Sequence, residues 1–365
     1  MRFWACLPLA LMLAACGGTA AAPASSAPAS AQARPASAAA SAASLAAPAA
    51  SAAGSAQAKP SGSAPIKIAY ASLTAMGLPN EVAVDTGIFA RNGLNAEVLY
   101  IAGSPNTIKA TIAGDVQFAS VGTSASVQAD LGGANLIAVA TGSPGLAFRL
   151  YSRPEINSVA DLKGKRIVEG QIGSDPDLAL KLALPRAGLA YNDVQLLHVD
   201  GNNPGEMSAY KSSGAEAMIL TAGGFGQAEK EFGAKMLLDI QAQKIPYNQA
   251  AMVATRTWID AHPDETQRFV RSYAEALKYI VQNRDQAIKI IEKYTKNDDH
   301  AVSAEAYDFY VQAAGHRLPY TTDEGTQTLL NLLAETKPDA KNHKPSEFAD
   351  NRFVQQLEKE GFSPD

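Results

Sequence analysis

A regular alternation of β-rich and helical segments, which begins at Ile66, constrains the fold more than any other feature of the sequence. The stretch 66–71 is β-rich, 79–92 has helical spacing with Asn92-Gly93 as its stop, and 96–101 is β-rich again. Strands that alternate with helices form βαβ units, whose strands lie parallel in one sheet. The sequence therefore predicts an α/β protein.

The alternation runs through two sets of segments and ends in a helical third. The first set contains expected strands at 66–71, 96–101, 116–121 and 136–140, and expected helices at 79–92, 104–114 and 123–131. The second set contains expected strands at 147–151, 165–168, 194–199, 217–220 and 235–240, and expected helices at 174–187 and 205–212. We expect a strand at 249–255 that returns to the first set, and then helices at 263–283, 285–294, 304–314 and 325–334.

The first 16 residues have the composition of an export signal. Arg2 precedes an apolar run from Phe3 to Ala15, which is too short for a membrane span because such a helix needs about 20 residues. The segment Leu13-Ala14-Ala15-Cys16 resembles the bacterial lipobox, in which the cysteine is acylated and becomes the first residue after cleavage. We expect a lipoprotein signal peptide at 1–16 with lipidation at Cys16. An ordinary signal peptide with an incidental cysteine is the alternative.

Residues 17–64 form a segment of low complexity. Alanine accounts for 23 of its 48 residues, serine for 10 and proline for 5. With so few large apolar side chains, burial cannot offset the entropy lost when the chain is ordered. We expect a disordered tether with a root-mean-square reach of about 40 Å, which would lift a folded part off a membrane surface.

Composition excludes several functions. All 36 acidic residues lie after residue 65, and so acidic a part lacks the basic face that nucleic-acid binding requires. Cys6 and Cys16 are the only cysteines, which excludes disulfides, cysteine-bound metals and a thiol nucleophile from the body. The five histidines are dispersed, and HExxH, GxxxxGK(S/T), GxSxG and GxGxxG motifs are missing. We expect no catalytic residue, no metal and no cofactor.

Small polar loops follow the expected strands at six comparable points, which are 72–74, 103–104, 122–124, 141–143, 173–175 and 221–223. In an open parallel sheet, ligands bind beyond the carboxyl ends of the strands, where helix N-termini present free N–H groups. A single loop of this kind is ordinary turn and capping chemistry, but six of them favour a cleft for a small polar molecule. Tyr70, Phe225 and Tyr247 either wall this cleft or pack in the core. The candidate ligand-binding residues are Ser72, Leu73, Gly103, Ser104, Thr123, Ser124, Thr141, Gly142, Ser174, Asp175, Thr221, Gly223, Phe225 and Asn248.

Four stretches carry a family resemblance that runs through residues 66–335. They are IKIAYASLTAMGLP with DTGIFARNGLNAEV, SPNTIKATIAGDVQFASVGTSASVQADLGGANLIAVAT, SVADLKGKRIVEGQIGSDPDLALKLALPRAGL, and AAMVATRTWIDAHPDETQRFVRSYAEALKYI. Taken in order, they resemble the nitrate/sulfonate/taurine-binding group of substrate-binding proteins of ABC importers. This group shares its fold with the thiamine-pyrimidine synthases.

The resemblance implies the type II periplasmic-binding-protein fold, with two α/β lobes that close on a ligand by a hinge motion. Lobe 1 would comprise 66–145 plus 245–365, and lobe 2 would comprise 146–244, with hinges near 141–147 and 244–250. Two features depart from the family. Val116-Gln117-Phe118 stands where many members have an acidic residue, and no arginine lies in the six loops. Arg149 is either a cation that turns inward or an exposed residue.

The function implied is that of a lipid-anchored, extracytoplasmic solute-binding protein. It would capture a small organic solute (sulfonate, carboxylate or pyrimidine-like) and deliver it to a membrane permease with a cytoplasmic ATPase. We expect a monomer that is held at the periplasmic or outer face of the membrane by Cys16. A ligand-sensing receptor ectodomain is one alternative. An enzyme of the thiamine-pyrimidine-synthase type is another, although the body lacks the cysteine-rich motif of that group.

Overall fold

The computed structural model describes residues 65–199 and 203–365. The expected signal peptide at 1–16, the expected tether at 17–64 and the expected lipidation at Cys16 lie outside the described residues. All described residues belong to one compact unit. No helix in this part of the chain combines the length and the apolar character needed to cross a membrane.

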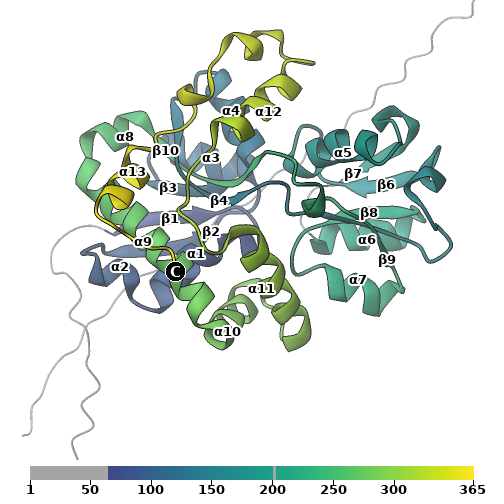
Figure 1. Cartoon of the computed structure of the whole chain (residues 1–365), viewed down its shortest axis with the longest axis horizontal. Coiled ribbons are helices and arrows are strands. Elements are labelled where there is room, and N and C mark those ends of the chain that lie inside the picture. Colours follow the sequence, from purple (N-terminus) through teal and green to yellow (C-terminus); the bar gives the residue numbers. More distant parts are fainter. Residues whose placement is uncertain (1–64, 200–202) are drawn as a thin grey trace, which may run out of the picture. The chain divides into compact units, whose positions relative to one another are not determined.

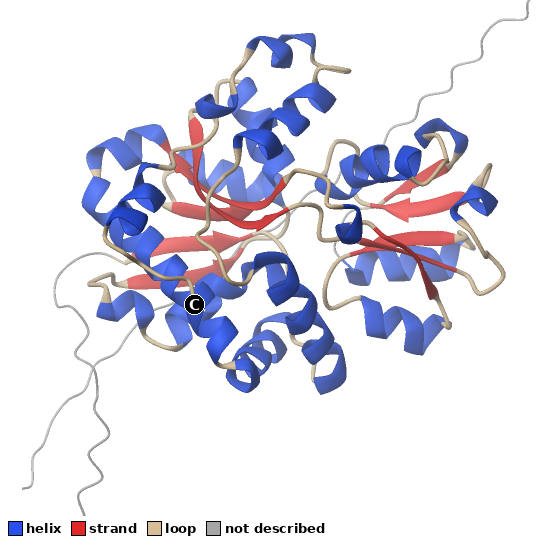
Figure 2. Ribbon diagram, in the orientation of Figure 1, coloured by secondary structure: helices blue, strands red, loops and turns tan. Residues whose placement is uncertain are grey.

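Two five-stranded sheets form the framework of the protein, and Figure 2 shows both with helices packed around them. The first sheet has the strand order β2-β1-β3-β10-β4 (Figure 1). Strand β1 is parallel to β2 and β3, whereas β10 is antiparallel to β3 and β4. Its strands are β1 (Ile66–Tyr70), β2 (Ala96–Tyr100), β3 (Phe118–Val121), β4 (Leu136–Pro144) and β10 (Asn248–Thr255).

The second sheet repeats this pattern, with the order β7-β6-β8-β5-β9. Strand β6 is parallel to β7 and β8, and β5 is antiparallel to β8 and β9. The expected return of the 249–255 strand to the first set is confirmed, because β10 pairs with β3 and β4. The strands of the second sheet are β5 (Arg149–Ser152), β6 (Arg166–Glu169), β7 (Gln195–His198), β8 (Ala217–Leu220) and β9 (Lys235–Asp239).

Most helices begin where the sequence predicts them. Those that follow strands are α1 (Leu78–Asp85), α2 (Ile88–Arg91), α3 (Ser104–Ala113), α4 (Thr123–Leu131), α5 (Asp175–Arg186), α6 (Asn203–Ser213) and α7 (Phe225–Phe232). The C-terminal third contains α8 (Arg256–Ala261), α9 (Pro263–Gln282), α10 (Arg284–Thr295), α11 (His300–Ala314), α12 (Asp323–Leu333) and α13 (Arg352–Lys359). Short 3₁₀ helices occur at η1 (Ala75–Gly77), η2 (Val159–Leu162), η3 (Tyr191–Asp193), η4 (Gln241–Gln243), η5 (Pro338–Asn342) and η6 (Pro345–Glu347).

The prediction of a single helix at 79–92 is wrong, because the structure has two helices, α1 and α2, in its place. They are separated at Gly87, whose φ of 72° lies in the left-handed region that glycine adopts without steric cost. Helices α8 and α13 were not expected either. They are only 6 and 8 residues long, and a periodic pattern is weak over so short a segment.

Helix α9 attaches the C-terminal helices to the first sheet. Its apolar stripe is buried as the spacing predicts, with Phe269, Tyr273 and Ile280 at most 1% exposed. The ring of Phe269 stacks on that of Phe118 in β3, with centroids 3.8 Å apart. Because burial of one such side chain stabilises the fold by roughly 1.5–3 kcal/mol, the stripe holds α9 firmly on the sheet.

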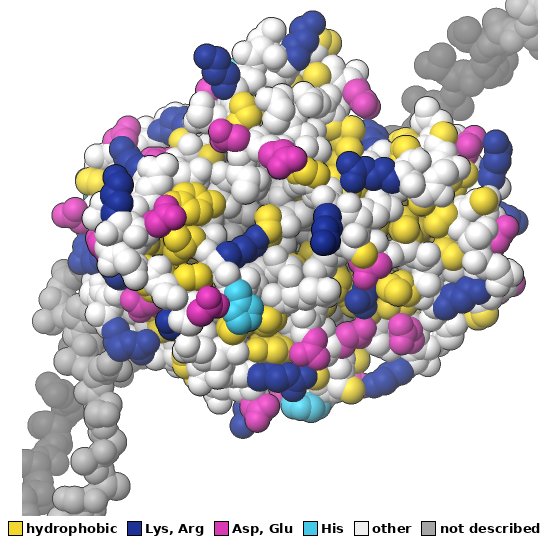
Figure 3. Space-filling model, in the orientation of Figure 1, with side chains coloured by type: hydrophobic (Ala, Val, Ile, Leu, Met, Phe, Trp, Pro, Cys, Tyr) yellow, Lys and Arg dark blue, Asp and Glu magenta, His cyan; other side chains and the backbone are white. Residues whose placement is uncertain are grey.

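The surface mixes charges of both signs. On the face shown in Figure 3, Lys and Arg side chains alternate with Asp and Glu side chains, and no broad basic area is visible there. Nucleic-acid binding through phosphates needs such an area.

Candidate ligand-binding site

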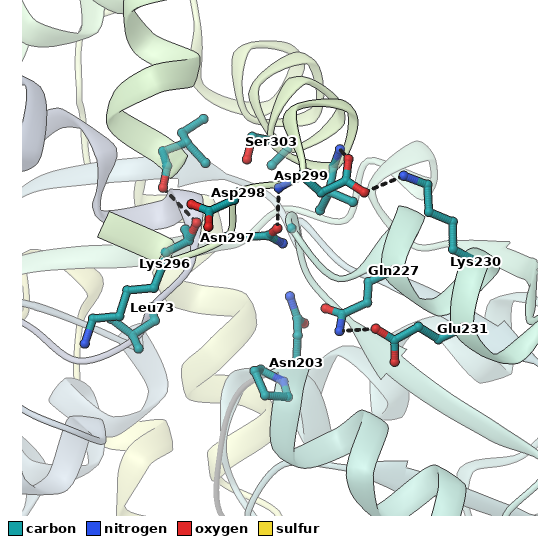
Figure 4. A pocket seen from close by; sticks show the side chains of 16 residues that line it. Leu73, Asn203, Gln227, Lys230, Glu231, Lys296, Asn297, Asp298, Asp299 and Ser303 are labelled. Carbon is teal, nitrogen blue, oxygen red and sulfur yellow. Dashed lines mark hydrogen bonds and ion pairs between the residues drawn. The ribbon is translucent and has the colours of Figure 1, made fainter. Parts of the chain in front are cut away.

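A pocket of about 390 Å³ lies under helix α11, and we call it the α11 pocket (Figure 4). Elements that follow strands of both sheets line it: the loop after β1, the loop after β8, and helices α6 and α7, together with the α10–α11 turn. Both sheets therefore contribute to its wall. The lining residues are Leu73, Asn203, Pro204, Gly223, Gln227, Lys230, Glu231, Ile291, Thr295, Lys296, Asn297, Asp298, Asp299, Val302, Ser303 and Ala306.

Some of the charged side chains at the rim of the α11 pocket are paired with other side chains of the chain. Lys230 of α7 donates to Asp299 with Nζ and Oδ2 2.6 Å apart, and this pair joins α7 to the start of α11 (Figure 4). Asp299 also caps α11, since its Oδ1 accepts from Ala301 N at 3.0 Å. Gln227 donates to Glu231 at 2.7 Å. Lys296 and Asp298 also line the pocket, are exposed, and form no ion pair with any described residue, so the rim offers one cation and one carboxylate to an entering solute.

The inner wall of the α11 pocket carries a buried polar atom without a partner. Ser303 is 1% exposed, and its Oγ makes no hydrogen bond with any described residue. Two further atoms, Tyr310 OH and Asn80 Oδ1, are likewise buried and unpaired within the described part of the chain. A buried polar group left unpaired costs about 1–3 kcal/mol. These atoms are therefore free to bond a ligand or water.

A second group of candidate residues meets around Asp175, and we call Ser104, Gly122, Ser124, Asp175 and Tyr247 the Asp175 cluster. Asp175 begins α5, whereas Ser124 lies in α4 beside the first sheet. Oδ1 of Asp175 accepts from Ser124 N at 3.0 Å and from Tyr247 OH at 2.8 Å. Ser104 Oγ accepts from Gly122 N at 3.0 Å. The structure thus brings together three of the six loops predicted from the sequence.

Burial raises the pKa of Asp175, while the hydrogen bonds from Tyr247 and from the Ser124 backbone oppose this rise. The pKa of Tyr247 is raised well above its ordinary value, first by burial and then by the adjacent Asp175. Its phenol therefore stays protonated as the donor to Asp175. Thr123 Oγ1, Ser124 Oγ and Ser174 Oγ are buried in this part of the chain and have no hydrogen-bond partner among the described residues.

Two other candidate ligand-binding residues, Asn248 and Thr141, form hydrogen bonds inside the protein. Asn248 is 1% exposed; its Nδ2 donates to Thr322 O and Thr326 Oγ1, and its Oδ1 accepts from Thr322 N and Oγ1. Thr141 Oγ1 lies 2.7 Å from Thr321 Oγ1. These polar atoms hold the segment before α12 against β4 and β10.

Phe225 packs in the core rather than along the wall of the α11 pocket. It is fully buried, with its ring centroid 5.8 Å from that of Tyr151 and 4.8 Å from that of Phe309. The guanidinium of Arg149 lies over the Phe225 ring and pairs with Asp239 at 3.3 Å and with Glu305 at 3.4 Å. Arg149 does turn inward, but its charge is already balanced by two carboxylates.

The remaining candidates lie at the loops where they were expected. Thr221 Oγ1 donates to Ala147 O at 3.0 Å, and Ser72 Oγ donates to Thr74 Oγ1 at 3.3 Å. Gly103 has a φ of 81°, and Gly142 faces Tyr273 OH so closely that a Cβ there would lie 3.1 Å from it. Leu73 and Gly223 line the α11 pocket.

Several pocket residues were not predicted from the sequence. Asn203 holds the loop after β8, because its Oδ1 accepts from Thr221 N and its Nδ2 donates to Thr221 O, both at 3.0 Å. Ser303 and the 296–299 turn were missed, since they lie in the helical third, which was interpreted as core. Asp299, an N-cap residue directly before a helical pattern, is the one signal that could have directed attention there.

Buried carboxyl groups lie on elements of the second sheet. Glu169 ends β6 and is fully buried; burial, followed by the charges of Asp177 and Glu206, raises its pKa to about 9, and it contacts His198. Burial raises the pKa of Glu206 to about 8. Even so, residues 65–199 and 203–365 contain no group of three or more His, Cys, Asp or Glu side chains that could hold a metal ion.

A second hollow, of about 450 Å³, lies at the amino ends of β1 and β2 and is lined in part by Pro65, Asp85 and Ala96. Asp85 is already paired, with Lys293 Nζ at 2.7 Å and Tyr294 OH at 2.9 Å. Ligands of parallel sheets bind at the opposite, carboxyl ends of the strands. The α11 pocket is therefore the better candidate.

Comparisons with known proteins agree with this fold. A family model described as NMT1/THI5 like matches residues 78–287, which is more than half of the chain. A protein of Brucella abortus, whose name calls it a binding protein without naming a ligand, is 26% identical over 279 residues, which cover 74% of this chain and 84% of that protein. The family match confirms the resemblance predicted from the sequence.

Solved structures share the architecture. The alkanesulfonate-binding protein SsuA of Xanthomonas axonopodis pv. citri, bound to MOPS, aligns with a TM-score of 0.62 at 17% identity and covers 76% of this chain and 94% of its own. The zinc-bound ligand-binding component of an ABC-type import system from Staphylococcus aureus aligns with a TM-score of 0.68 at 14% identity and covers 80% and 98%. The predicted periplasmic-binding-protein-like fold is thereby confirmed.

Proposed function

We propose, from the premise that the chain belongs to the NMT1/THI5-like family, that it is the solute-binding component of an ABC importer. In this proposal the protein binds a small organic solute (sulfonate, carboxylate or pyrimidine-like) and performs no chemistry on it. The observation that carries the proposal is the α11 pocket, which elements following strands of both sheets line and in which Ser303 Oγ is buried and unpaired.

The proposal assigns 66–145 plus 245–365 to one lobe and 146–244 to the other, with hinges at the two crossings between the sheets. One crossing follows β4, and the other precedes β10. They are tied together, because Gly145 N donates to Tyr247 O at 2.7 Å and Ala147 N donates to Gln249 Oε1 at 2.6 Å. Bonds between adjacent crossings would let both segments bend as one hinge while the lobes stay rigid.

Several contacts that join the two sheets fit a closed conformation. They include Lys230 with Asp299, Gly226 N with Glu305 Oε2 at 2.7 Å, and Asp175 with Ser124 N. We propose that solute binding favours this closed state over an open one, since a solute can shift the equilibrium only through its higher affinity for one of the two. The closed form would then deliver the solute to a permease and its ATPase.

Export, and anchoring through a lipid on Cys16, complete the proposal. The tether at 17–64 would separate the folded part from the membrane, and the protein would act as a monomer at the periplasmic or outer face. Acyl labelling tests this directly: Cys16→Ser should abolish the label and release the protein from membranes. Unchanged membrane retention of Cys16→Ser would contradict lipid anchoring.

A ligand screen tests the binding function. Sulfonates, carboxylates, pyrimidines and amines are added separately to the purified protein. We expect one class to raise the melting temperature, because it raises the free energy of unfolding by RT ln(1 + [L]/Kd). Ser303→Ala should weaken binding of that class by about fivefold, because one hydrogen bond contributes about 1 kcal/mol.

Ser212→Ala is the matched control, since Ser212 is exposed on α6 and does not line the α11 pocket. It should bind the solute as the wild type does. If no class stabilises the protein, or if Ser303→Ala binds as tightly as Ser212→Ala, the α11 pocket is not the binding site.

A further inference from the structure

We infer that Arg149 is a positioning residue of the α11 pocket: it holds helix α11 against elements of the second sheet and thereby sets where Ser303 lies in the pocket wall. Arg149 is not one of the described residues that line the pocket, so it acts through α11 and not by touching the solute. The inference rests on the proposed function for the role of the pocket, whereas the position of α11 can be tested without any solute.

The charge of Arg149 joins the second sheet to α11. Arg149 begins β5, and its side chain is 19% exposed. Its Nε donates to Asp239 Oδ2 of β9 at 3.3 Å, and its Nη1 donates to Glu305 Oε1 of α11 at 3.4 Å. The guanidinium thus pairs with one carboxylate of the second sheet and with one of α11. Because like charges repel, the two carboxylates can both approach this position only while the cation is there.

Two aromatic rings fix the guanidinium of Arg149 in place. Its Cζ lies 4.6 Å from the centroid of the Phe225 ring and 4.8 Å from that of the Phe309 ring. Phe225 begins α7 and Phe309 lies in α11, and both rings are buried. A cation within about 6 Å of an aromatic centroid is attracted to the ring, and an arginine can stack on rings and pair with carboxylates at the same time. Arg149 therefore binds α11 through a ring as well as through a carboxylate.

The other oxygen of Glu305 binds the start of α7. Gly226 N donates to Glu305 Oε2 at 2.7 Å. Because α7 begins at Phe225, the Gly226 amide has no partner within its own helix. A Cβ on Gly226 would lie 3.0 Å from Glu305 Oε2 and 3.4 Å from Val302 Cγ2, so the glycine lets α11 come close. Both carboxylate oxygens of Glu305 are thus held by residues of β5 and α7.

The same stretch of α11 forms the pocket wall. Helix α11 packs against α7 (Figure 1), and its residues Val302 and Ser303 line the pocket, whereas Glu305 is held by Arg149 and Gly226. Along the helix axis, Ser303 and Glu305 are only about 3 Å apart, because each residue rises about 1.5 Å. A displacement of Glu305 therefore displaces the buried Ser303 hydroxyl as well.

Amide hydrogen exchange at Gly226, followed by NMR on the full-length protein without solute, tests the position of α11. We expect this amide to be protected in the wild type, since Glu305 is its hydrogen-bond partner. Arg149→Met keeps an apolar side chain between the two rings but removes the charge. It should speed exchange at Gly226 by at least about tenfold, because a hydrogen bond to a charged group is weakened. An unprotected Gly226 amide in the wild type would overturn the inference, and so would unchanged exchange in Arg149→Met.

Arg153→Met is the matched control. Arg153 also lies over a ring, that of Tyr210 at 5.0 Å, but it donates to Ala215 O and not to a residue of α11. This variant should leave exchange at Gly226 as it is in the wild type. Arg149→Lys keeps the charge without the planar group and should recover part of the protection. An equal loss of protection in Arg153→Met would show a general loosening of the protein and would overturn the inference.

If Arg149→Met does not fold, Gly226→Ala tests the same contact from α7. Alanine favours a helix more than glycine does, so this variant should stay folded. Its methyl group would lie against Glu305 Oε2, and the amide at position 226 should therefore exchange faster than in the wild type. Wild-type exchange at this position in the folded variant would overturn the inference.

Binding measurements connect the position of α11 to the solute. Ethanesulfonate, acetate, cytosine and ethylamine serve as probes, one from each class of the ligand screen. Any probe that binds the wild type should bind Arg149→Met at least about fivefold more weakly, because the bond from Ser303 is lost or misplaced, and should bind Arg153→Met unchanged. Unchanged affinity in Arg149→Met would overturn the inference. If the wild type binds none of the probes while Arg149→Met still loses protection at Gly226, the proposed function fails and the position assigned to α11 stands.

Discussion

The Asp175 cluster and the α11 pocket both join elements of the two sheets, but they differ in how their polar atoms are satisfied. In the Asp175 cluster, the Tyr247 hydroxyl and the Ser124 N–H both donate to one buried carboxyl group, although Ser124 Oγ itself is buried without a partner in the described part of the chain. In the α11 pocket, Ser303 Oγ is buried and has no partner among the described residues. Paired groups stabilise a closed arrangement, whereas unpaired groups cost free energy until a ligand or water bonds them. The bonds to Asp175 therefore support closure, and the unpaired Ser303 Oγ is suited to a solute.

We expect the largest effect on stability at Glu206. This carboxyl is 4% exposed, and burial raises its pKa to about 8. The unfolded carboxyl loses its proton near the ordinary value of 4.5, so from about pH 4.5 to pH 8 the native state binds more protons than the unfolded state. Stability therefore falls as pH rises through this window. Glu206→Gln cannot ionise, and we expect it to match the wild type near pH 5 and to be about 2–4 kcal/mol more stable at pH 8.

Urea unfolding at pH 5 and pH 8 measures this difference. The control is Glu335→Gln, in which an exposed carboxyl is replaced by the same amide and no such divergence is expected. Equal pH dependence of Glu206→Gln and the wild type would show that burial of Glu206 does not govern stability. In that case ionisation of the buried Glu206 carboxyl would cost the folded protein little free energy.

Two tyrosines provide the sharpest test of the comparison, because both are 1% exposed and differ in whether the hydroxyl is paired. Tyr247→Phe removes a donor from Asp175 and should destabilise the protein by about 1–2 kcal/mol. Tyr310→Phe removes an unpaired hydroxyl and should leave stability unchanged or raise it by up to about 1 kcal/mol. Chemical denaturation of both variants side by side gives the result. Equal losses would contradict the distinction between paired and unpaired buried hydroxyls.

We expect the smallest effect on stability at the rim of the α11 pocket. Lys230 and Asp299 are 54% and 41% exposed, and pairs as open as this are screened by salt and contribute little to folding. Lys230→Gln should therefore unfold at nearly the same urea concentration as the wild type, with any difference vanishing at high salt. The exposed residue Lys211 provides the control, Lys211→Gln. A large loss of stability in Lys230→Gln alone would show that this pair stabilises the protein in spite of its exposure.

Local sequence patterns predicted most of the fold because their causes are local. Strand β1 and helix α3 follow from alternating apolar residues, from Pro105 at a helix start and from Gly114 at a helix end. The loops after β3, β6 and β8 were predicted for the same reason, and Leu73 and Gly223 do line the α11 pocket. The break at Gly87 was missed because glycine within a helical pattern does not by itself show a left-handed conformation.

The sequence by itself determined the alternating α/β plan, the positions of the polar loops and the absence of cysteine chemistry from the body. Only the tertiary structure decided which polar atoms are paired. Asp175 meets Ser124 across 51 residues, and Ser303 reaches the α11 pocket from a helix whose spacing is that of a core element. Whether a buried polar atom has a hydrogen-bond partner depends on residues that are distant in the chain, so no local sequence pattern predicts it. Which polar atoms are left to bond a solute depends on this pairing, and for this reason Ser303 could be identified only from the folded protein.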